Sequence, residues 1–60
     1  MRDMRLSVPS VLSVGRYSIV VLARTTPQAM KLAREIDPTA KLDYYDLERD
    51  GTMIVVFVRG

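Results

Sequence analysis

Short apolar runs separated by turn residues predict a series of strands around one helix. Arg2–Val8 alternates apolar and polar residues with a period of two, which is typical of a strand with one solvated face. Pro9 cannot donate to a strand ladder and therefore favours a strand end or an edge strand, with Val11–Val14 continuing the strand after a kink. Arg16–Arg24 is apolar on both alternating faces, which indicates a strand that is covered on both sides.

The segment that follows carries the strongest helix signal of the chain. Thr26 is the predicted N-cap, and Pro27 follows at the first helical position, where its missing N–H costs nothing. Pro38 disfavours helical geometry at Asp37, so the helix is expected to end there. One apolar stripe has helical spacing and consists of Ala29, Leu32, Ala33 and Ile36.

The last third of the chain predicts a β-hairpin. Asp50-Gly51 is a dipeptide that favours a two-residue type I′ turn between the strands Leu42–Arg49 and Met53–Val58. Counting outward from that turn gives four cross-strand pairs: Arg49 with Thr52, Leu47 with Ile54, Tyr45 with Val56, and Tyr44 with Phe57. This register places Leu42, Tyr44, Met53, Val55 and Phe57 on one face of the hairpin.

These elements predict an α+β fold, a small three- to four-stranded, mainly antiparallel sheet with one helix on one face. The order is ββαββ, or βαββ if residues 1–15 form a looser N-terminal strand or arm, and residues 1–60 form a single domain. Two alternatives fit the same order. The strand Tyr17–Ala23, the helix and the strand Leu42–Arg49 can form a parallel βαβ crossover, and a β-grasp arrangement is also compatible.

One short helix covers only one face of such a sheet, so the other face needs a second cover. If exposed, its apolar residues would form a patch of roughly several hundred Å², which soluble monomers seldom show. A second copy that packs sheet to sheet or joins through the edge strands would bury the patch and would stabilise a chain this small. We therefore expect a homo-oligomer, a dimer or larger, and the candidate interface residues are Val20, Leu22, Tyr44, Met53, Val55 and Phe57.

The charge balance suggests a second kind of partner. Nine Lys and Arg residues stand against seven Asp and Glu residues, and the net charge of +2 is unevenly spread. Residues 1–24 carry +3, whereas residues 42–60 carry −2. A basic front half can guide a polyanion, DNA or RNA, to the surface. The candidate nucleic-acid contacts are Arg2, Arg5, Arg16 and Arg24.

Several function classes are not supported by any pattern in the sequence. The chain has no His and no Cys, so it offers no histidine base for a serine nucleophile and no Cys/His zinc site. Asp46-x-Glu48-x-Asp50-Gly51 resembles the start of an EF-hand loop, but the position of the bidentate Glu is Phe57. We expect no catalytic residue, no metal and no cofactor, and hence a non-enzymatic protein.

The longest apolar runs, Ile19–Ala23 and Met53–Val58, are far shorter than the ~20 residues that span a bilayer. We therefore expect no membrane association and, because cysteine is absent, a cytoplasmic location.

The predicted function is a small binding module that self-associates through its sheet and binds nucleic acid through its arginines. The alternative is a protein-interaction, inhibitory or regulatory module without nucleic-acid binding, which meets its partner by edge-strand addition or through the acidic hairpin residues Asp43, Asp46 and Glu48.

One short run resembles a known kind of domain. Leu32–Ala40, which contains Ile36-Asp37-Pro38-Thr39-Ala40, is similar to the helix-to-strand junction of small ferredoxin-like regulatory domains in the C-terminal cytosolic parts of some bacterial membrane proteins. The resemblance covers nine residues and contains no catalytic residue. It implies a sheet with a helix on one side that assembles from several copies.

Overall fold

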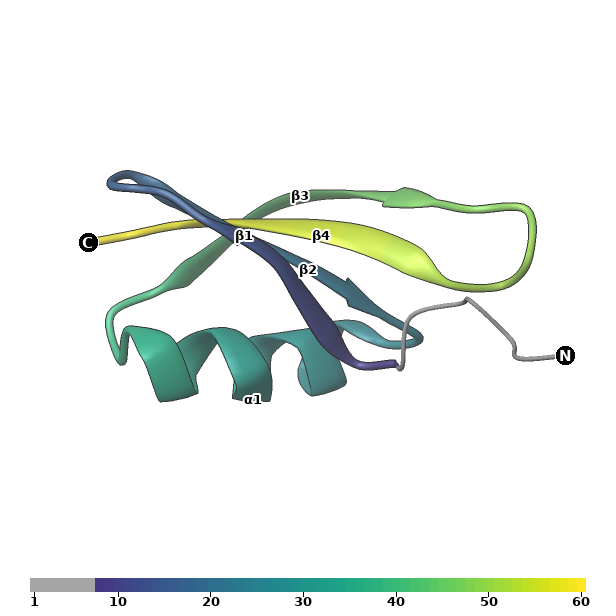
Figure 1. Ribbon diagram of the computed structural model, residues 1–60, viewed down its shortest axis with the longest axis horizontal. Helices are drawn as coiled ribbons and strands as arrows, with labels where there is room; N and C mark the ends of the chain where they lie inside the picture. The colour runs from purple at the N-terminus through teal and green to yellow at the C-terminus, as the bar shows by residue number, and fades with distance from the viewer. Residues whose placement is uncertain (1–7) are drawn as a thin grey trace, which may run out of the picture.

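Residues 8–60 are described by the computed structural model, and they form one sheet and one helix (Figure 1). The elements in chain order are β1 (Ser10–Val14), β2 (Ser18–Ala23), α1 (Thr26–Ile36), β3 (Lys41–Leu47) and β4 (Met53–Val58). The predicted α+β class is confirmed: the four-stranded sheet is antiparallel throughout and carries the helix on one face.

The strand order across the sheet is β1-β2-β4-β3. β2 and β3 both run antiparallel to β4, so they point the same way but are not neighbours. The predicted parallel crossover is therefore present, because α1 links the parallel strands β2 and β3 of one sheet, with β4 inserted between them. The β-grasp alternative is wrong, because the central pair β2·β4 is antiparallel. The composition of the last two strands explains their positions in the sheet. β4 is apolar along its whole length and lies in the centre, whereas β3 carries Lys41, Asp43 and Asp46 and lies at the edge.

The first strand of the described residues, Ser10–Val14, contains the predicted strand continuation Val11–Val14. Ser10–Val14 pairs with β2, and the register shifts by one residue between Val11 and Ser13. Apart from Val8, which lies in a bend, the predicted strand Arg2–Val8 falls outside the described residues.

The helix begins one residue before the predicted position. Thr25 is the N-cap, and its side chain accepts a hydrogen bond from the Gln28 N–H at 3.2 Å. Thr26, the predicted N-cap, is already helical, and Pro27 lies within the first turn, where its ring is tolerated. The helix ends as predicted at Asp37, whose N–H donates to the carbonyl of Ala33 at 2.9 Å.

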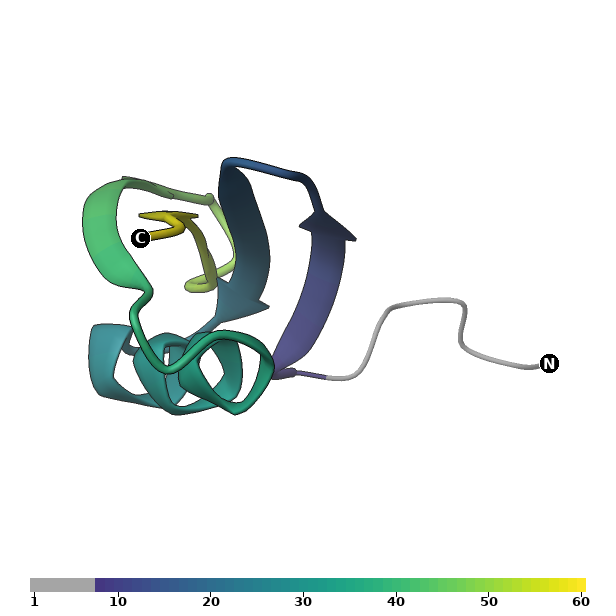
Figure 2. The same cartoon turned by 90° about the vertical axis from the view of Figure 1, so that its left-hand side faces the viewer.

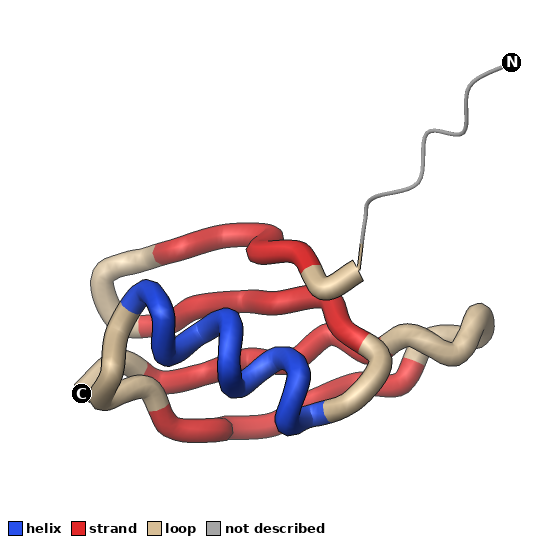
Figure 3. The backbone as a smooth tube through the Cα atoms, turned by 90° about the horizontal axis from the view of Figure 1, so that it is seen from below, coloured by secondary structure: helices blue, strands red, loops and turns tan. Residues whose placement is uncertain are grey.

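The hydrophobic core lies between α1 and the sheet. The helix crosses the sheet obliquely and packs mainly on β2, with fewer contacts to β1 and β4 (Figures 2 and 3). Small residues on the helix allow this close approach, because the buried helical positions are both alanine. The fully buried residues are Ile19, Val21, Ala23, Ala29, Ala33, Ala40, Val55 and Phe57.

The β3–β4 turn differs from the predicted one. A type I′ turn needs positive φ at both central residues, but in residues 8–60 only Gly51 has a positive φ, at 91°. Glu48 donates to the carbonyl of Thr52 at 2.8 Å, and Gly51 donates to the carbonyl of Glu48 at 3.2 Å. The loop is therefore three residues long, with glycine in the positive-φ position that such loops require.

The longer loop shifts the hairpin register by one residue. The observed pairs are Leu47 with Met53, Asp46 with Ile54, Tyr45 with Val55, and Tyr44 with Val56, followed by an irregularity and then Leu42 with Phe57. The predicted pairing of Tyr44 with Phe57 is wrong. Because side chains alternate along a strand, the shift places residues 44–47 of β3 on the face opposite to their predicted β4 partners. The irregularity between Leu42 and Tyr44 shifts the register again, so Leu42 lies on the same face as Phe57, as predicted.

Candidate interaction surfaces

The face of the sheet turned away from α1 is apolar along its central strands. Residues that pair directly across strands point to the same face, so the register identifies this surface. Its apolar side chains are Val20, Leu22, Tyr44, Ile54, Val56 and Val58, and we call this set the open face. Tyr44 and Val58 are 56% and 44% exposed, and no other element of residues 8–60 lies on this side (Figure 2).

Half of the predicted interface residues lie on the open face. Val20, Leu22 and Tyr44 do, whereas Met53, Val55 and Phe57 lie on the helix side, where Val55 and Phe57 are fully buried. The predicted placement of Met53, Val55 and Phe57 on the uncovered face is thus wrong. β4 is apolar at every position, so its own sequence does not distinguish its two faces.

The open-face residues of β4 that sequence reasoning missed are Ile54, Val56 and Val58. They pair with the β3 residues Asp46, Tyr44 and Lys41, respectively, and the charged residue Asp46 opposite Ile54 would have identified the solvent-facing side of β4. This inference requires the correct hairpin register, which depends on the loop length and on the irregularity between Leu42 and Tyr44.

Two side chains of opposite charge, Lys41 and Asp46, lie on the same side of the sheet as the open face, near the two ends of β3. Lys41 pairs with Val58 near one end of the strand, and Asp46 pairs with Ile54 near the other end, with Tyr44 between them. The acidic end continues into an open depression at the base of the hairpin loop. Its apolar part is formed by Leu12, Leu22 and Ile54, and its polar part by Glu48, Arg49, Asp50 and Thr52.

The hairpin loop is held by a local carboxylate. Asp50 Oδ1 accepts hydrogen bonds from the N–H of Thr52 at 3.0 Å and from its hydroxyl at 2.6 Å. These bonds favour the charged form, so the Thr52 hydroxyl and then its N–H lower the pKa of Asp50, with a smaller contribution from the charge of Arg24. The loop is therefore an ordered rim of the depression.

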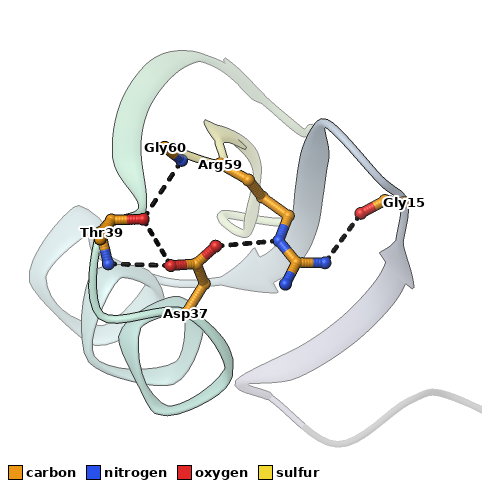
Figure 4. A network of polar contacts seen from close by, with 5 residues as sticks. All are labelled: Gly15, Asp37, Thr39, Arg59 and Gly60. Carbon is orange, nitrogen blue, oxygen red and sulfur yellow. Dashed lines mark hydrogen bonds and ion pairs between the residues drawn. The ribbon is translucent and has the colours of Figure 1, made fainter.

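A polar network lies at the end of the molecule opposite the β3–β4 loop (Figures 1 and 4). Asp37 Oδ1 accepts from the N–H and the hydroxyl of Thr39, and its Oδ2 accepts from Arg59 Nε at 3.0 Å. Arg59 Nη1 donates to the carbonyl of Gly15 at 3.0 Å, and the Gly60 N–H donates to the Thr39 hydroxyl at 3.2 Å. The network thus joins the β1–β2 turn, the end of α1 and the end of β4.

Both carboxylate oxygens of Asp37 accept hydrogen bonds within this network. Hydrogen bonds from the Thr39 side chain first, and then from Arg59, lower the pKa of Asp37 to about 2. A carboxylate that is fully ionised and already paired at neutral pH is unsuited to exchange protons with a substrate. We therefore assign the network a structural role.

The candidate nucleic-acid residues do not form one patch in residues 8–60. Arg16 lies in the β1–β2 turn, and Arg24 directly follows β2, so the six residues of β2, about 20 Å of strand, lie between them. Both side chains are exposed. Arg2 and Arg5 lie outside the described residues.

Residues 8–60 contain no group of three or more His, Cys, Asp or Glu residues that could hold a metal ion. The single helix of the described region is too short to cross a membrane. Comparisons of the chain with protein-family models, with curated proteins and with solved structures found no match.

Proposed function

We propose that this protein is a small non-enzymatic binding module that self-associates, with the open face of one copy packed against the open face of a second. The observation that carries the proposal is the contiguous apolar surface formed by the open face, which no other element of residues 8–60 covers. Burial of such a surface between two copies removes apolar area from water without requiring any rearrangement of the fold.

The charges on β3 favour a second copy as the partner. A two-fold axis that lies between the two sheets and crosses the strands brings the two β3 strands together in opposite directions. Lys41 of each copy then lies over Asp46 of the other, on either side of the two Tyr44 side chains. An isologous interface forms each contact twice, so one pair of opposite charges supplies two complementary contacts.

The size of the surface predicts a weak dimer. Four strands spaced ~4.8 Å apart, with six residues rising ~3.3 Å each, give a face of about 400 Å². Two copies would bury roughly 800 Å², compared with ~1,200–2,000 Å² in stable specific complexes. We therefore expect reversible association that depends on concentration in the micromolar range.

The first test measures the solution mass by light scattering and sedimentation over a wide concentration range. We expect a shift from monomer towards dimer as concentration rises, and Val20→Lys, at the centre of the open face, should abolish the shift. Leu47→Lys is the matched control, because Leu47 is 71% exposed but lies on the helix side. A chain that stays monomeric at every concentration, or a Val20→Lys variant that still dimerises, would overturn the proposal.

Charge exchange tests the orientation of the two copies. Lys41→Asp and Asp46→Lys should each weaken the dimer, because each creates like-charge contacts across the two-fold axis. The double variant restores opposite charges and should recover most of the wild-type association. Additive weakening in the double variant would exclude this orientation.

Nucleic-acid binding is a second candidate function, and its candidate contact residues are now those of the β1–β2 turn. Arg16 is exposed, and its neighbour Tyr17 is 73% exposed, so a cation and a stacking surface lie together. Single-stranded DNA and RNA should then bind at low ionic strength with a marked salt dependence that Arg16→Ala weakens. Arg24→Ala, at the other end of β2, should have less effect, and binding that is absent or insensitive to salt would exclude this candidate.

A further inference from the structure

The outer edge of β3 offers an unpaired strand. β3 is the last strand in the order β1-β2-β4-β3, and all seven of its residues are exposed. Glu48 is hydrogen-bonded to Thr52 across the hairpin, and hydrogen-bonded and non-hydrogen-bonded pairs alternate along an antiparallel ladder. The N–H and C=O groups of Tyr45 and Leu47 therefore point away from β4 and are available to another strand.

An apolar strip lies beside this edge on the helix side. Leu42, Tyr45 and Leu47 pair with Phe57, Val55 and Met53, respectively, so they point to the same side as the core. They are nevertheless 40%, 48% and 71% exposed, because α1 packs mainly on β2 and makes few contacts with β3. A strand added to β3 would thus find both backbone partners and apolar side chains on one side.

Charge determines which kind of strand fits. Residues 41–48 carry one cation, Lys41, and three carboxylates, Asp43, Asp46 and Glu48, a net charge of −2. Two copies joined edge to edge through β3 would bring two such acidic segments together, and like charges facing each other across a strand pair are destabilising. The same charges favour an incoming strand with basic residues.

We propose that the β3 edge binds an extended segment of another protein, six or seven residues long, in which apolar and basic residues alternate. The segment adds to the sheet as a fifth strand. Its apolar residues contact Leu42, Tyr45 and Leu47, and its basic residues lie beside Asp43 and Asp46. This surface differs from the open face, so the inference does not depend on self-association.

The test uses fluorescently labelled eight-residue peptides and measures binding by anisotropy at low ionic strength. An alternating valine–lysine peptide should bind, whereas an alternating valine–glutamate peptide should not. A peptide of the same composition as the first, with four valines followed by four lysines, should bind at least several-fold more weakly, because it cannot place one residue type on each face. Amide chemical-shift changes should concentrate on β3.

Two sets of variants separate the backbone from the charges. Tyr45→Pro removes an outward N–H, which an edge strand tolerates, and should abolish binding, whereas Tyr45→Thr keeps the N–H and should retain part of it. The triple variant Asp43→Asn, Asp46→Asn, Glu48→Gln should bind the basic peptide about tenfold more weakly. Glu35→Gln, an exposed carboxylate on α1, is the matched control and should change nothing.

All measurements are repeated in the Val20→Lys background, which removes the proposed dimer interface and leaves β3 intact. Peptide binding that persists there supports the edge site whatever the oligomeric state. Equal affinity for the lysine and glutamate peptides, unchanged affinity in the triple variant, or shift changes confined to the open face would overturn the inference. If Tyr45→Pro unfolds, as circular dichroism would show, the triple variant alone decides the outcome.

Discussion

Replacing Phe57 with alanine tests the observed placement of β4 most directly. Phe57 is fully buried beneath the helix and pairs with Ile19 and Leu42, so Phe57→Ala removes a large core side chain. Such truncations cost about 3–5 kcal/mol. A 60-residue protein has a total stability of roughly 3–9 kcal/mol, so the variant should lie close to the limit of folding. Val58→Ala, at the adjacent 44%-exposed position, should cost less than about 1 kcal/mol.

Urea and thermal unfolding followed by far-ultraviolet circular dichroism suit this comparison, because the chain contains no tryptophan. The melting temperature of Phe57→Ala should fall by at least about 12 °C, since each kcal/mol shifts it by ~4–8 °C in a domain of this size. The scans are repeated at several protein concentrations, because self-association would add to the apparent stability. A smaller loss for Phe57→Ala than for Val58→Ala would refute the assignment of the two faces.

Three further predictions concern the turn, the helix cap and the polar network. Gly51→Ala should cost about 1–2 kcal/mol in thermal unfolding, because Gly51 has a φ of 91° although an added Cβ would meet no atom within 4 Å. Gly15→Ala, where φ is not positive and the contacts would be ordinary, should cost less, and equal losses would contradict the three-residue loop. Thr25→Ala should cost about 1 kcal/mol and Thr26→Ala less, measured by urea unfolding, because only Thr25 caps the helix. The folded-state pKa of Asp37 is about 2 against an ordinary value of 3.8, so its contribution to stability is present above pH 4 and is lost as the pH falls towards 2. Unfolding measured from pH 2 to 5 should show a shallower decline for Asp37→Asn, and an identical decline would argue against the network.

The elements of this fold could be predicted from sequence because their signals are local. Helical spacing and the proline at position 38 identified the helix and its end, and apolar runs identified three of the four strands within about two residues. The hairpin register could not be predicted in the same way. Asp50-Gly51 fits both a two-residue and a three-residue loop, and the observed three-residue loop contains the hydrogen bonds from Thr52 to Asp50.

That one ambiguity accounts for much of the error in the predicted interface. A shift of one residue exchanges the faces of a strand, so Val55 and Phe57 were assigned to the surface instead of the core. Other features depend on contacts between distant parts of the chain. The ion pair of Asp37 with Arg59 joins residues 22 positions apart, and the edge position of β3 depends on the order of all four strands.

The two uncovered surfaces, the open face and the β3 edge, differ in cause and in charge pattern. An 11-residue helix is about 16 Å long and ~10 Å wide, so it covers less than half of one face of a sheet of roughly 19 by 20 Å. It therefore leaves the β3 edge uncovered on the helix side, whereas the open face is uncovered because no element of residues 8–60 lies on the other side of the sheet. The open face has Lys41 at one end and Asp46 at the other, which suits an antiparallel second copy. Residues 41–48 at the β3 edge have a net charge of −2, which disfavours edge-to-edge pairing with a second copy and favours a basic strand. The two proposals therefore assign different partners to the two surfaces of one sheet, a second copy to the open face and a basic strand of another protein to the β3 edge.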